Sequence, residues 1–262
     1  MRIIPRVAKT IYTKTKIPGL DYTLNQYVGC GHRCVYCYAK FIMKWRSYGE
    51  WGNWVEVKVN APELVKKYVK GNVSMSTVSD PYQPIEKEIK LTRSVLKNMD
   101  KRIKLSILTK SDLVLRDIDI IKNFENIEIG LTINGFKEKI RKILEPGAPS
   151  HEQRIRALRR MKQEGINTYC FISPIIPGLT DIERVLKDTN NIPQYYIIEF
   201  INMGLAGQKF REVLRKISQD SLNIIEDSSR MTNFIIEIKK MIKERNIPVS
   251  NIITHQKKRY WD

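Results

Sequence analysis

The stretch Tyr22–Tyr38 decides the fold and reads YTLNQYVGCGHRCVYCY. Its beginning, Tyr22–Val28, is rich in apolar and β-favouring residues, which is typical of a strand. The part that follows carries Cys30, Cys34 and Cys37 in the spacing C-x3-C-x2-C. The N-terminal segment MRIIPRVAKT has no long apolar run. We therefore expect no secretory signal, a cytoplasmic protein and no disulfide framework.

Three clustered thiols in a reducing compartment predict a metal site. A structural zinc ion takes four protein ligands, so zinc would also need His32 or the distant Cys170. Alternatively, three thiols can hold three irons of a [4Fe–4S] cluster and leave the fourth iron open. An open iron can bind a substrate or a cofactor, whereas a closed structural site cannot.

Outside this stretch, β-rich apolar runs alternate with segments of helical periodicity, which predicts parallel βαβ units. The predicted strands are Tyr22–Val28, Val73–Val78, Lys104–Leu108, Ile127–Ile133, Asn167–Ile172 and Tyr195–Ile201. The predicted helices are Pro62–Lys70, Leu91–Met99, Val114–Asn123, His151–Glu164 and Asp181–Asp188. The fourth of these helices has an N-cap signal in Ser150 and Gln153 and a stop signal in Gly165.

Six such strands predict an α/β fold, a partial (β/α)6 TIM-type barrel with additional C-terminal helices. A doubly wound sheet is the alternative, because periodicity does not distinguish the two. We expect a single domain with an N-terminal extension over 1–20 and the partial barrel over 20–205. Residues 206–262 are expected to form a helical cover and a basic tail, with a final strand over 248–254.

The composition adds information on partners. The formal net charge is +18 and the apolar fraction is 42%, which excludes an intrinsically disordered chain. Such a charge attracts polyanions, although a general bias toward soluble, Lys-rich sequence is the alternative. The tail Lys257–Trp261 suits phosphates and stacked bases, or is simply a solvated end. No apolar run approaches the roughly 18–20 residues of a membrane span, so we expect no membrane association.

The cysteine spacing, with the aromatic Tyr36 just before the last cysteine, resembles the radical S-adenosylmethionine (SAM) superfamily. Short strings near the other predicted strand ends extend the resemblance to its spore photoproduct lyase-like, or DNA repair photolyase-like, branch over residues 20–182. These strings are Tyr38, Ser79-Asp80, Thr109-Lys110, Thr132 with Asn134, Glu145-Pro146-Gly147 and the turn from Pro174 to Asp181.

The resemblance implies cofactors and roles. Cys30, Cys34 and Cys37 would ligate three irons of a [4Fe–4S] cluster, and SAM would chelate the fourth iron. The implied cofactor-binding residues are Tyr36, Ser79, Asp80, Lys110, Thr132 and Asn134. The implied enzyme cleaves SAM reductively to a 5′-deoxyadenosyl radical, which abstracts a hydrogen atom from a substrate. A ferredoxin or flavodoxin would supply the electron.

The resemblance and the basic charge together predict a nucleic-acid substrate, DNA or RNA, in repair or base modification. One residue departs from the lyase pattern, because Thr77 stands where the lyase has a hydrogen-donating cysteine. Cys170 is the candidate that would replace it, and Tyr82 or Tyr36 is the candidate for a radical relay. The alternatives are a radical SAM enzyme acting on a protein or small molecule, and a zinc-stabilised nucleic-acid-binding protein.

Overall fold

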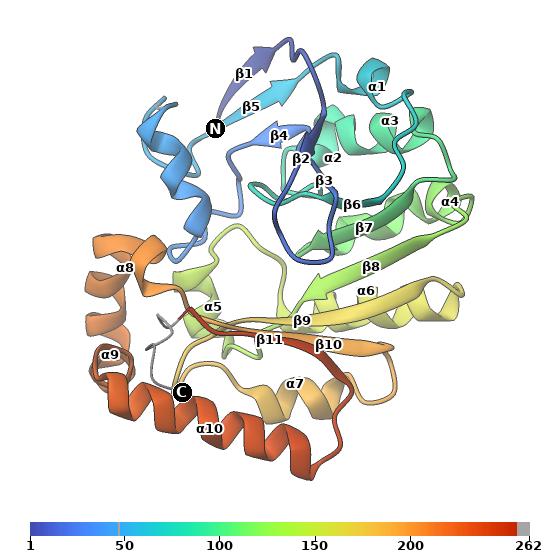
Figure 1. Ribbon diagram of the computed structural model, residues 1–262. Coiled ribbons are helices and arrows are strands. Elements are labelled where there is room, and N and C mark those ends of the chain that lie inside the picture. The colour runs from blue at the N-terminus through green and yellow to red at the C-terminus, as the bar shows by residue number, and fades with distance from the viewer. Residues whose placement is uncertain (47, 256–262) are drawn as a thin grey trace.

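The computed structural model describes residues 1–46 and 48–255, so the predicted basic tail over 257–261 lies outside the described residues. Eight of the described strands form a main sheet in the order β11-β10-β9-β8-β7-β6-β3-β2 (Figure 1). They are β2 (Tyr12–Lys14), β3 (Tyr22–Leu24), β6 (Asn72–Met75), β7 (Lys104–Thr109), β8 (Ile127–Thr132), β9 (Asn167–Ile175), β10 (Tyr195–Phe200) and β11 (Val249–Ile253).

All neighbours in the main sheet are parallel except β2 and β3, which are antiparallel. The six strands from β3 to β10 lie side by side in the order in which the chain makes them. A doubly wound sheet reverses that order at a switch point, whereas a barrel does not. The predicted partial (β/α)6 barrel is therefore confirmed. Because β2 and β11 are edge strands, the barrel stays open.

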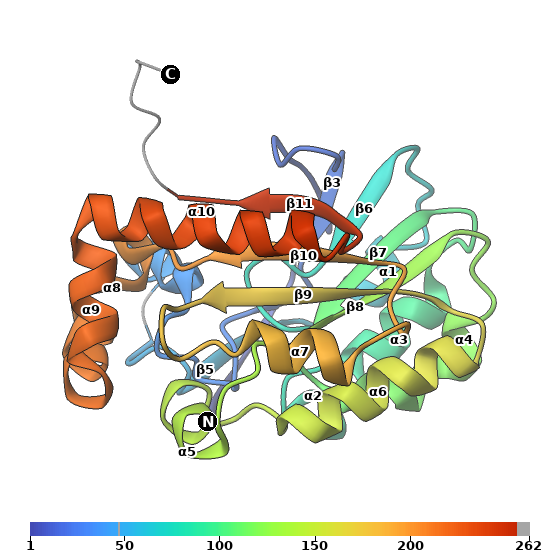
Figure 2. The same ribbon diagram turned by 90° about the horizontal axis from the view of Figure 1, so that it is seen from below.

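Helices follow most strands and cover the outer face of the sheet, where Figure 2 shows α10 alongside β10 and β11. The α-helices are α1 (Ala61–Leu64), α2 (Glu86–Ile89), α3 (Leu91–Asn98), α4 (Ile118–Ile121), α5 (Glu138–Leu144), α6 (His151–Gln163), α7 (Ile182–Asp188), α8 (Met203–Ile217), α9 (Gln219–Glu226) and α10 (Ser228–Glu244). Two 3-10 helices are η1 (Tyr38–Lys44) and η2 (Asp112–Asp117).

The first predicted strand, Tyr22–Val28, is wrong as a single element. It is divided into β3 in the main sheet and β4 (Tyr27–Val28), which pairs antiparallel with β5 (Trp54–Lys58). Gln26 causes the division, because its amide is fully buried and must find partners. It donates to Thr92 at 2.8 Å and accepts from Ser76 at 3.2 Å. The chain therefore leaves the main sheet just before the cysteines.

The smaller sheet, β1-β5-β4, was not expected. Its first strand, β1 (Arg2–Arg6), comes from the predicted N-terminal extension and pairs parallel with β5. Two predicted helices also differ. The helix expected over 62–70 is only the short α1, and that expected over 114–123 is divided between η2 and α4. Short elements of this kind depend on tertiary packing rather than on local propensity.

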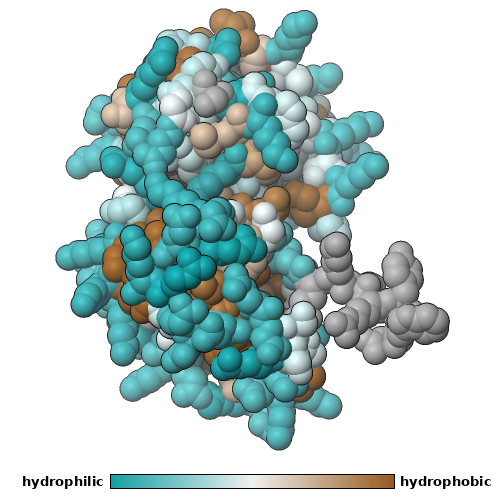
Figure 3. All heavy atoms as spheres, turned by 90° about the vertical axis from the view of Figure 1, so that its left-hand side faces the viewer, coloured by the Kyte–Doolittle hydropathy of each residue, from teal (hydrophilic) through white to brown (hydrophobic). Residues whose placement is uncertain are grey.

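The C-terminal helices pack against the barrel. Met231, Ile235 and Ile242 of α10 are buried in the main hydrophobic core. Phe210 and Leu214 of α8 belong to a second cluster beside the segment that carries Cys30, Cys34 and Cys37, which we call the cysteine loop. None of the described helices is long and apolar enough to cross a membrane. The face drawn in Figure 3 is mostly hydrophilic, with hydrophobic residues in smaller patches.

Candidate active site

A cavity of about 320 Å³ lies at the carboxyl ends of the barrel strands, where barrel enzymes carry out their chemistry. The volume is that of a small-molecule site, about 300–1,000 Å³. Cys30, Cys34 and Cys37 all line it. Each strand end adds residues, among them Ser76–Asp80 after β6, Leu108–Lys110 from β7, Thr132 from β8, Phe171, Ser173 and Pro174 from β9, and Glu199–Asn202 at the end of β10.

Hydrogen bonds to its backbone hold the cysteine loop from two segments of the chain. The Gln83 side chain accepts from the Gly31 N–H at 2.7 Å and donates to the Gly29 carbonyl at 3.2 Å. From the opposite side, the Gly147 N–H donates to the His32 carbonyl at 3.0 Å. A Cβ at Gly147 would lie 2.3 Å from the Gly31 carbonyl oxygen, so only glycine permits this approach. The protein's own hydrogen bonds thus hold the loop in place.

Asp80 joins this loop to the ends of β6 and β7. Its carboxylate accepts from the Thr109 hydroxyl at 2.6 Å and from the Lys110 N–H at 2.8 Å. It also accepts from the Tyr82 N–H at 2.9 Å and lies 3.4 Å from the His32 Nδ1. Burial alone would raise the pKa of Asp80, but His32 and these donors outweigh it and lower the pKa to about 2. Asp80 is therefore an ionised anchor within the wall.

Lys110 supplies the positive charge of the cavity. Burial opposes its charged form, but Cys34, Glu145 and Asp80 together favour that form and raise its pKa. The ammonium group therefore stays protonated inside the cavity. A half-buried, protonated lysine is suited to pair with a ligand carboxylate.

A buried ion pair supports the wall behind Lys110. Arg154 of α6 donates to Glu145, and both side chains are almost fully excluded from solvent. Glu145 also accepts from the Tyr36 hydroxyl and, at 2.9 Å, from the Asn134 amide. Burial acts to raise the pKa of Glu145, but Arg154 and Lys110 prevail and lower it to about 2. The pair thus ties the cysteine loop to β8 and α6.

The opposite wall carries polar groups that the sequence did not single out as site residues. Ser173 of β9 donates to Glu199 of β10 at 2.6 Å, and the His255 Nε2 lies 3.1 Å from the same carboxylate. All three residues line the cavity. Their only sequence signal was their position at strand ends, which is shared by many turn residues.

Thr77 and Tyr38 lie between the two walls. The Tyr38 hydroxyl donates to the Thr77 carbonyl, and the Asn25 amide donates to the Thr77 hydroxyl at 3.1 Å. Both Thr77 and Tyr38 line the cavity. The position that the resemblance gives to a cysteine thus faces the cavity as a threonine.

Three of the predicted site residues do not line the cavity. Cys170 is fully buried in the main core, and Tyr82 is fully buried with its hydroxyl unpartnered among the described residues. Asn134 is occupied by Glu145. Cys170 and Tyr82 therefore lie outside the lining of this cavity, and the Asn134 amide bonds the buried carboxylate of its wall. Tyr36 lines the cavity by its ring, while its hydroxyl bonds Glu145.

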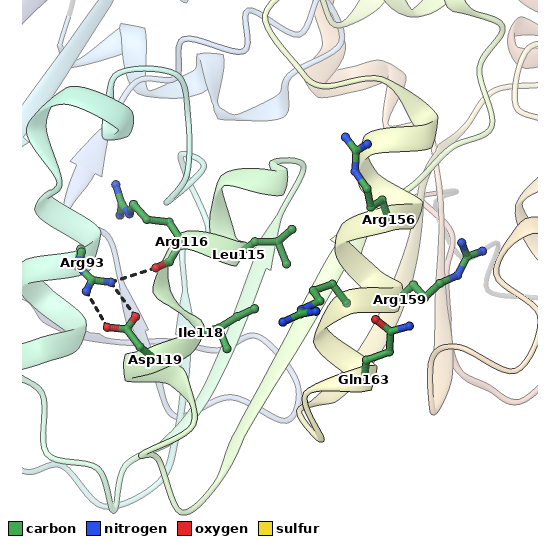
Figure 4. A pocket seen from close by; sticks show the side chains of 9 residues that line it. Arg93, Leu115, Arg116, Ile118, Asp119, Arg156, Arg159 and Gln163 are labelled. Atoms are coloured by element: carbon green, nitrogen blue, oxygen red, sulfur yellow. Dashed lines mark hydrogen bonds and ion pairs between the residues drawn. The ribbon is translucent and has the colours of Figure 1, made fainter.

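A second concavity lies on the outer surface between α6 and the η2–α4 segment, shown in Figure 4. It shares no lining residue with the cysteine cavity. Several arginines line it, but Arg93 pairs with Asp117 and Asp119, and Arg116 pairs with Glu86. Much of its charge is thus compensated within the protein.

The thiols fit a multi-iron group. Burial raises the pKa of all three, that of Cys34 to about 12, so a cation must bind before they act as thiolates. Among the residues described, no three His, Cys, Asp or Glu side chains converge as ligands of one ion would. The cysteines of a four-iron cluster each bind a different iron and need no such convergence.

An open barrel with three free thiols and polar strand ends around one cavity is the arrangement of a radical SAM enzyme. The model of the radical SAM superfamily matches residues 24–188, and the chain belongs to that superfamily. The family implies SAM and an iron–sulfur cluster as cofactors. The resemblance inferred from the cysteine loop is thereby confirmed.

Two relatives are similar in sequence. The Methanocaldococcus jannaschii protein MJ0683 is 48% identical over 256 residues, which cover 97% of this chain and 98% of that protein. The ORF301 protein of Acidianus two-tailed virus is 29% identical over 210 residues, which cover 74% of this chain and 67% of the viral protein.

Solved structures with a similar fold include two of spore photoproduct lyase. A lyase variant gives a TM-score of 0.65 at 16% identity, covering 96% of this chain and 82% of the lyase chain. The lyase complexed with dinucleoside spore photoproduct gives 0.58 at 17% identity, covering 83% and 66%. Streptococcus suis SuiB bound to precursor peptide SuiA gives 0.55 at 14%, covering 88% and 48%. The chain thus spans about two thirds of the lyase in that complex and half of SuiB.

Proposed function

We propose that Cys30, Cys34 and Cys37 hold a [4Fe–4S] cluster and that SAM binds beside it in the same cavity. The observation that carries this proposal is the meeting of the three thiols with Lys110 and the strand-end polar groups around one cavity. Bound together, the cluster and SAM supply a 5′-deoxyadenosyl radical that abstracts a hydrogen atom from the substrate. An electron carrier such as a ferredoxin or flavodoxin is the proposed reductant.

The chain's own residues bind and orient SAM. The Lys110 ammonium pairs with the SAM carboxylate, because it is a protonated cation that lines the cavity. The Ser79 and Thr132 side chains, which also line the cavity, complete the polar contacts. Asp80 holds the ends of β6 and β7 together. The apolar side chains of Phe171, Phe200 and Ile201 keep water away from the reacting atoms.

We infer that the substrate is a nucleic acid. The net charge of +18 supports this class, because a basic protein binds the phosphate backbone through counterion release. One structural neighbour, spore photoproduct lyase, is complexed with a dinucleoside lesion. Thr77 favours base modification over lyase repair, because a hydroxyl is a poor hydrogen-atom donor where the lyase pattern has a thiol. A peptide is the second candidate, since SuiB binds a precursor peptide.

The reaction class is tested with the anaerobically reconstituted protein. Iron and sulfide are added, the protein is reduced with dithionite, SAM is supplied, and 5′-deoxyadenosine is measured by chromatography. We expect 5′-deoxyadenosine from the wild type and none from Cys34→Ala. A second variant, Cys170→Ala, is the matched control, because Cys170 lies in the core away from the cavity. Zinc uptake without iron would contradict the proposal.

The substrate class is tested by incubating the same protein with DNA, RNA or a peptide pool. We expect nucleic acid to increase the yield of 5′-deoxyadenosine and to acquire a change in mass. The nucleic acid is also prepared with deuterated nucleosides. We expect deuterium to pass from it into 5′-deoxyadenosine, so SAM itself needs no label. Transfer from a deuterated peptide instead would favour the second candidate.

A further inference from the structure

Glu199, near the end of β10, is a carboxylate of the cavity that the SAM binding proposed above does not use. Two strands, β8 and β9, separate β10 from β7, whose end precedes Lys110. On its other side β10 pairs with the edge strand β11, and His255 follows that strand (Figure 2). Glu199 therefore lies between the residues proposed for SAM and the open margin of the barrel.

Two neighbours fix the orientation of the Glu199 carboxylate. The Ser173 hydroxyl donates to its Oε2 at 2.6 Å, and the His255 Nε2 lies 3.1 Å from its Oε1. A carboxylate oxygen only accepts, so the His255 Nε2 carries the proton of the second bond. Each oxygen is thus held by a residue from a different side of β10.

The Glu199 carboxylate keeps acceptor sites for a ligand. Its two oxygens offer about four acceptor sites, and the described residues use one site on each oxygen. The side chain is 24% exposed, whereas those of Asp80 and Glu145 are 10% and 0% exposed. Asp80 and Glu145 are engaged within the wall, but Glu199 can accept one more hydrogen bond on each oxygen.

Two free acceptors side by side select among the groups of a nucleic acid. A phosphate is itself an anion, and a 2′-hydroxyl offers a single donor. Among the common bases, only guanine presents two adjacent N–H donors, N1–H and the N2 amino group, on its Watson–Crick edge. Adenine, cytosine, thymine and uracil place an acceptor beside each donor of that edge, and this acceptor would meet a carboxylate oxygen.

The lining of the cavity also suits a planar base. Tyr38 and Phe171 bring aromatic rings to it, and Ile17 and Leu20 bring apolar side chains from the margin of the barrel. Bases taken out of a helix are bound by stacking on such side chains and by hydrogen bonds to the Watson–Crick edge. The cavity thus offers both kinds of contact beside one carboxylate.

We propose that Glu199 is the residue that selects the substrate base, by accepting hydrogen bonds from N1–H and the N2 amino group of guanine. Ser173 and His255 are the positioning residues that orient its carboxylate. This inference rests on the proposed nucleic-acid substrate and names the base that enters the cavity.

The test is a binding measurement that needs no turnover. The reconstituted protein without SAM is titrated into fluorescent single-stranded oligonucleotides, each a run of thymidine or uridine in which only the central base varies. Fluorescence anisotropy gives the dissociation constants. We expect the wild type to bind the oligonucleotide with central guanine about tenfold more tightly than that with central adenine.

Glu199→Gln should reverse this preference. An amide offers one donor and one acceptor, which is the pattern that adenine presents. The Ser173 hydroxyl can accept from the new amide, so both contacts of the wall can persist. Glu128→Gln is the matched control, because it removes the same charge from another barrel strand, where Glu128 accepts from the Tyr195 hydroxyl at 2.7 Å and lies outside the lining of this cavity. We expect the control to keep the preference for guanine.

Wild-type protein gives a second measurement that needs no variant. Hypoxanthine lacks the N2 amino group of guanine, so the oligonucleotide with central inosine should bind several-fold more weakly than that with guanine. Equal binding of inosine and guanine would overturn the inference. So would a guanine-to-adenine ratio that is the same in Glu199→Gln and the wild type, since the carboxylate would then serve SAM or the wall alone. Either result leaves the nucleic-acid substrate standing, whereas wild-type protein that binds none of the oligonucleotides overturns both proposals.

Discussion

Asp80 and Glu145 are two buried carboxylates whose hydrogen bonds connect separate parts of the cavity wall. Asp80 joins β7 to the loop after β6, and Glu145 joins the cysteine loop to α6. Each stays ionised because the donors around it outweigh the cost of burial. A single substitution at either position therefore affects several elements at once.

The stability of the protein should depend on acid pH through these two groups. Their pKa values are about 2 in the folded protein, below the ordinary values of 3.8 and 4.5. Their stabilising contribution is thus complete above the ordinary values and is lost as the pH falls toward 2. We expect the free energy of unfolding, measured by urea titration, to fall over this range. Asp80→Asn should show a shallower fall, and an unchanged pH profile would refute the role of Asp80.

Arg154 gives a test of the buried ion pair. Arg154→Met leaves the Glu145 carboxylate buried without its cation and should cost about 3–5 kcal/mol in urea unfolding. The double variant Glu145→Gln, Arg154→Met should recover part of that loss, because no unpaired charge remains. Arg159→Met, on the exposed face of the same helix, should change stability by less than about 0.5 kcal/mol. Equal losses at Arg154 and Arg159 would contradict this account.

Among the elements, the cysteine loop is the one that depends most on its neighbours. It is fixed from one side by Gln83 and from the other by the turn at Gly147. The two contacts come from segments about fifty and more than a hundred residues away in sequence. The geometry of the loop therefore depends on contacts with distant parts of the barrel.

Gly147→Ala should impair loading of the cluster while the barrel stays folded. The added Cβ would meet the Gly31 carbonyl oxygen at 2.3 Å, so the cysteine loop must move. We expect iron bound per chain after reconstitution to fall several-fold, with little change in circular dichroism. Gly204→Ala is the control, since its Cβ would meet only Asn202 Oδ1, at 3.4 Å. Full iron content in Gly147→Ala would show that the loop tolerates displacement.

Local signals predicted some elements well. The helix predicted over 151–164 matches α6, because Ser150 and Gln153 form a capping box within four residues of sequence. The small sheet was missed because it pairs β1 with β5, about fifty residues apart, and because Glu56 interrupts the apolar pattern of β5. Glu56 is buried there by its ion pair with Arg46. Pairing between distant segments leaves no mark in local periodicity.

The candidate site, like the fold, could be predicted from the sequence only in part. The cysteine spacing and the strand-end residues Ser79, Asp80, Lys110 and Thr132 could be predicted to lie together, because parallel strand ends meet at one edge. The hydrogen-bond partner of Asn134 could not be predicted, since it depends on the buried Glu145–Arg154 pair. Glu199 was missed because a strand-end glutamate has many uses.

At the scale of the whole molecule, the charge of +18 predicts how substrate binding responds to salt. If nucleic acid binds, log K should fall linearly with log salt concentration. Lys16→Ala should reduce the slope by about 0.7–0.9, because Lys16 adjoins Ile17 at the cavity. The double variant Arg156→Ala, Arg159→Ala is the control, since these residues line the separate outer concavity. Fluorescence anisotropy measures the salt dependence of binding for both variants. Binding that does not change with salt would contradict the prediction.

The open barrel has a consequence for how a long polymer can be handled. Ile17 and Leu20, between edge strand β2 and its neighbour β3, line the same cavity as His255, which comes just after edge strand β11. The two margins of the sheet thus face one another across the cavity, and among the described strands β2 and β11 are not paired with each other. A closed ring admits only what can enter through its end. An open barrel can receive one residue from the middle of a continuous polymer. Neither a free end of the polymer nor threading is then required.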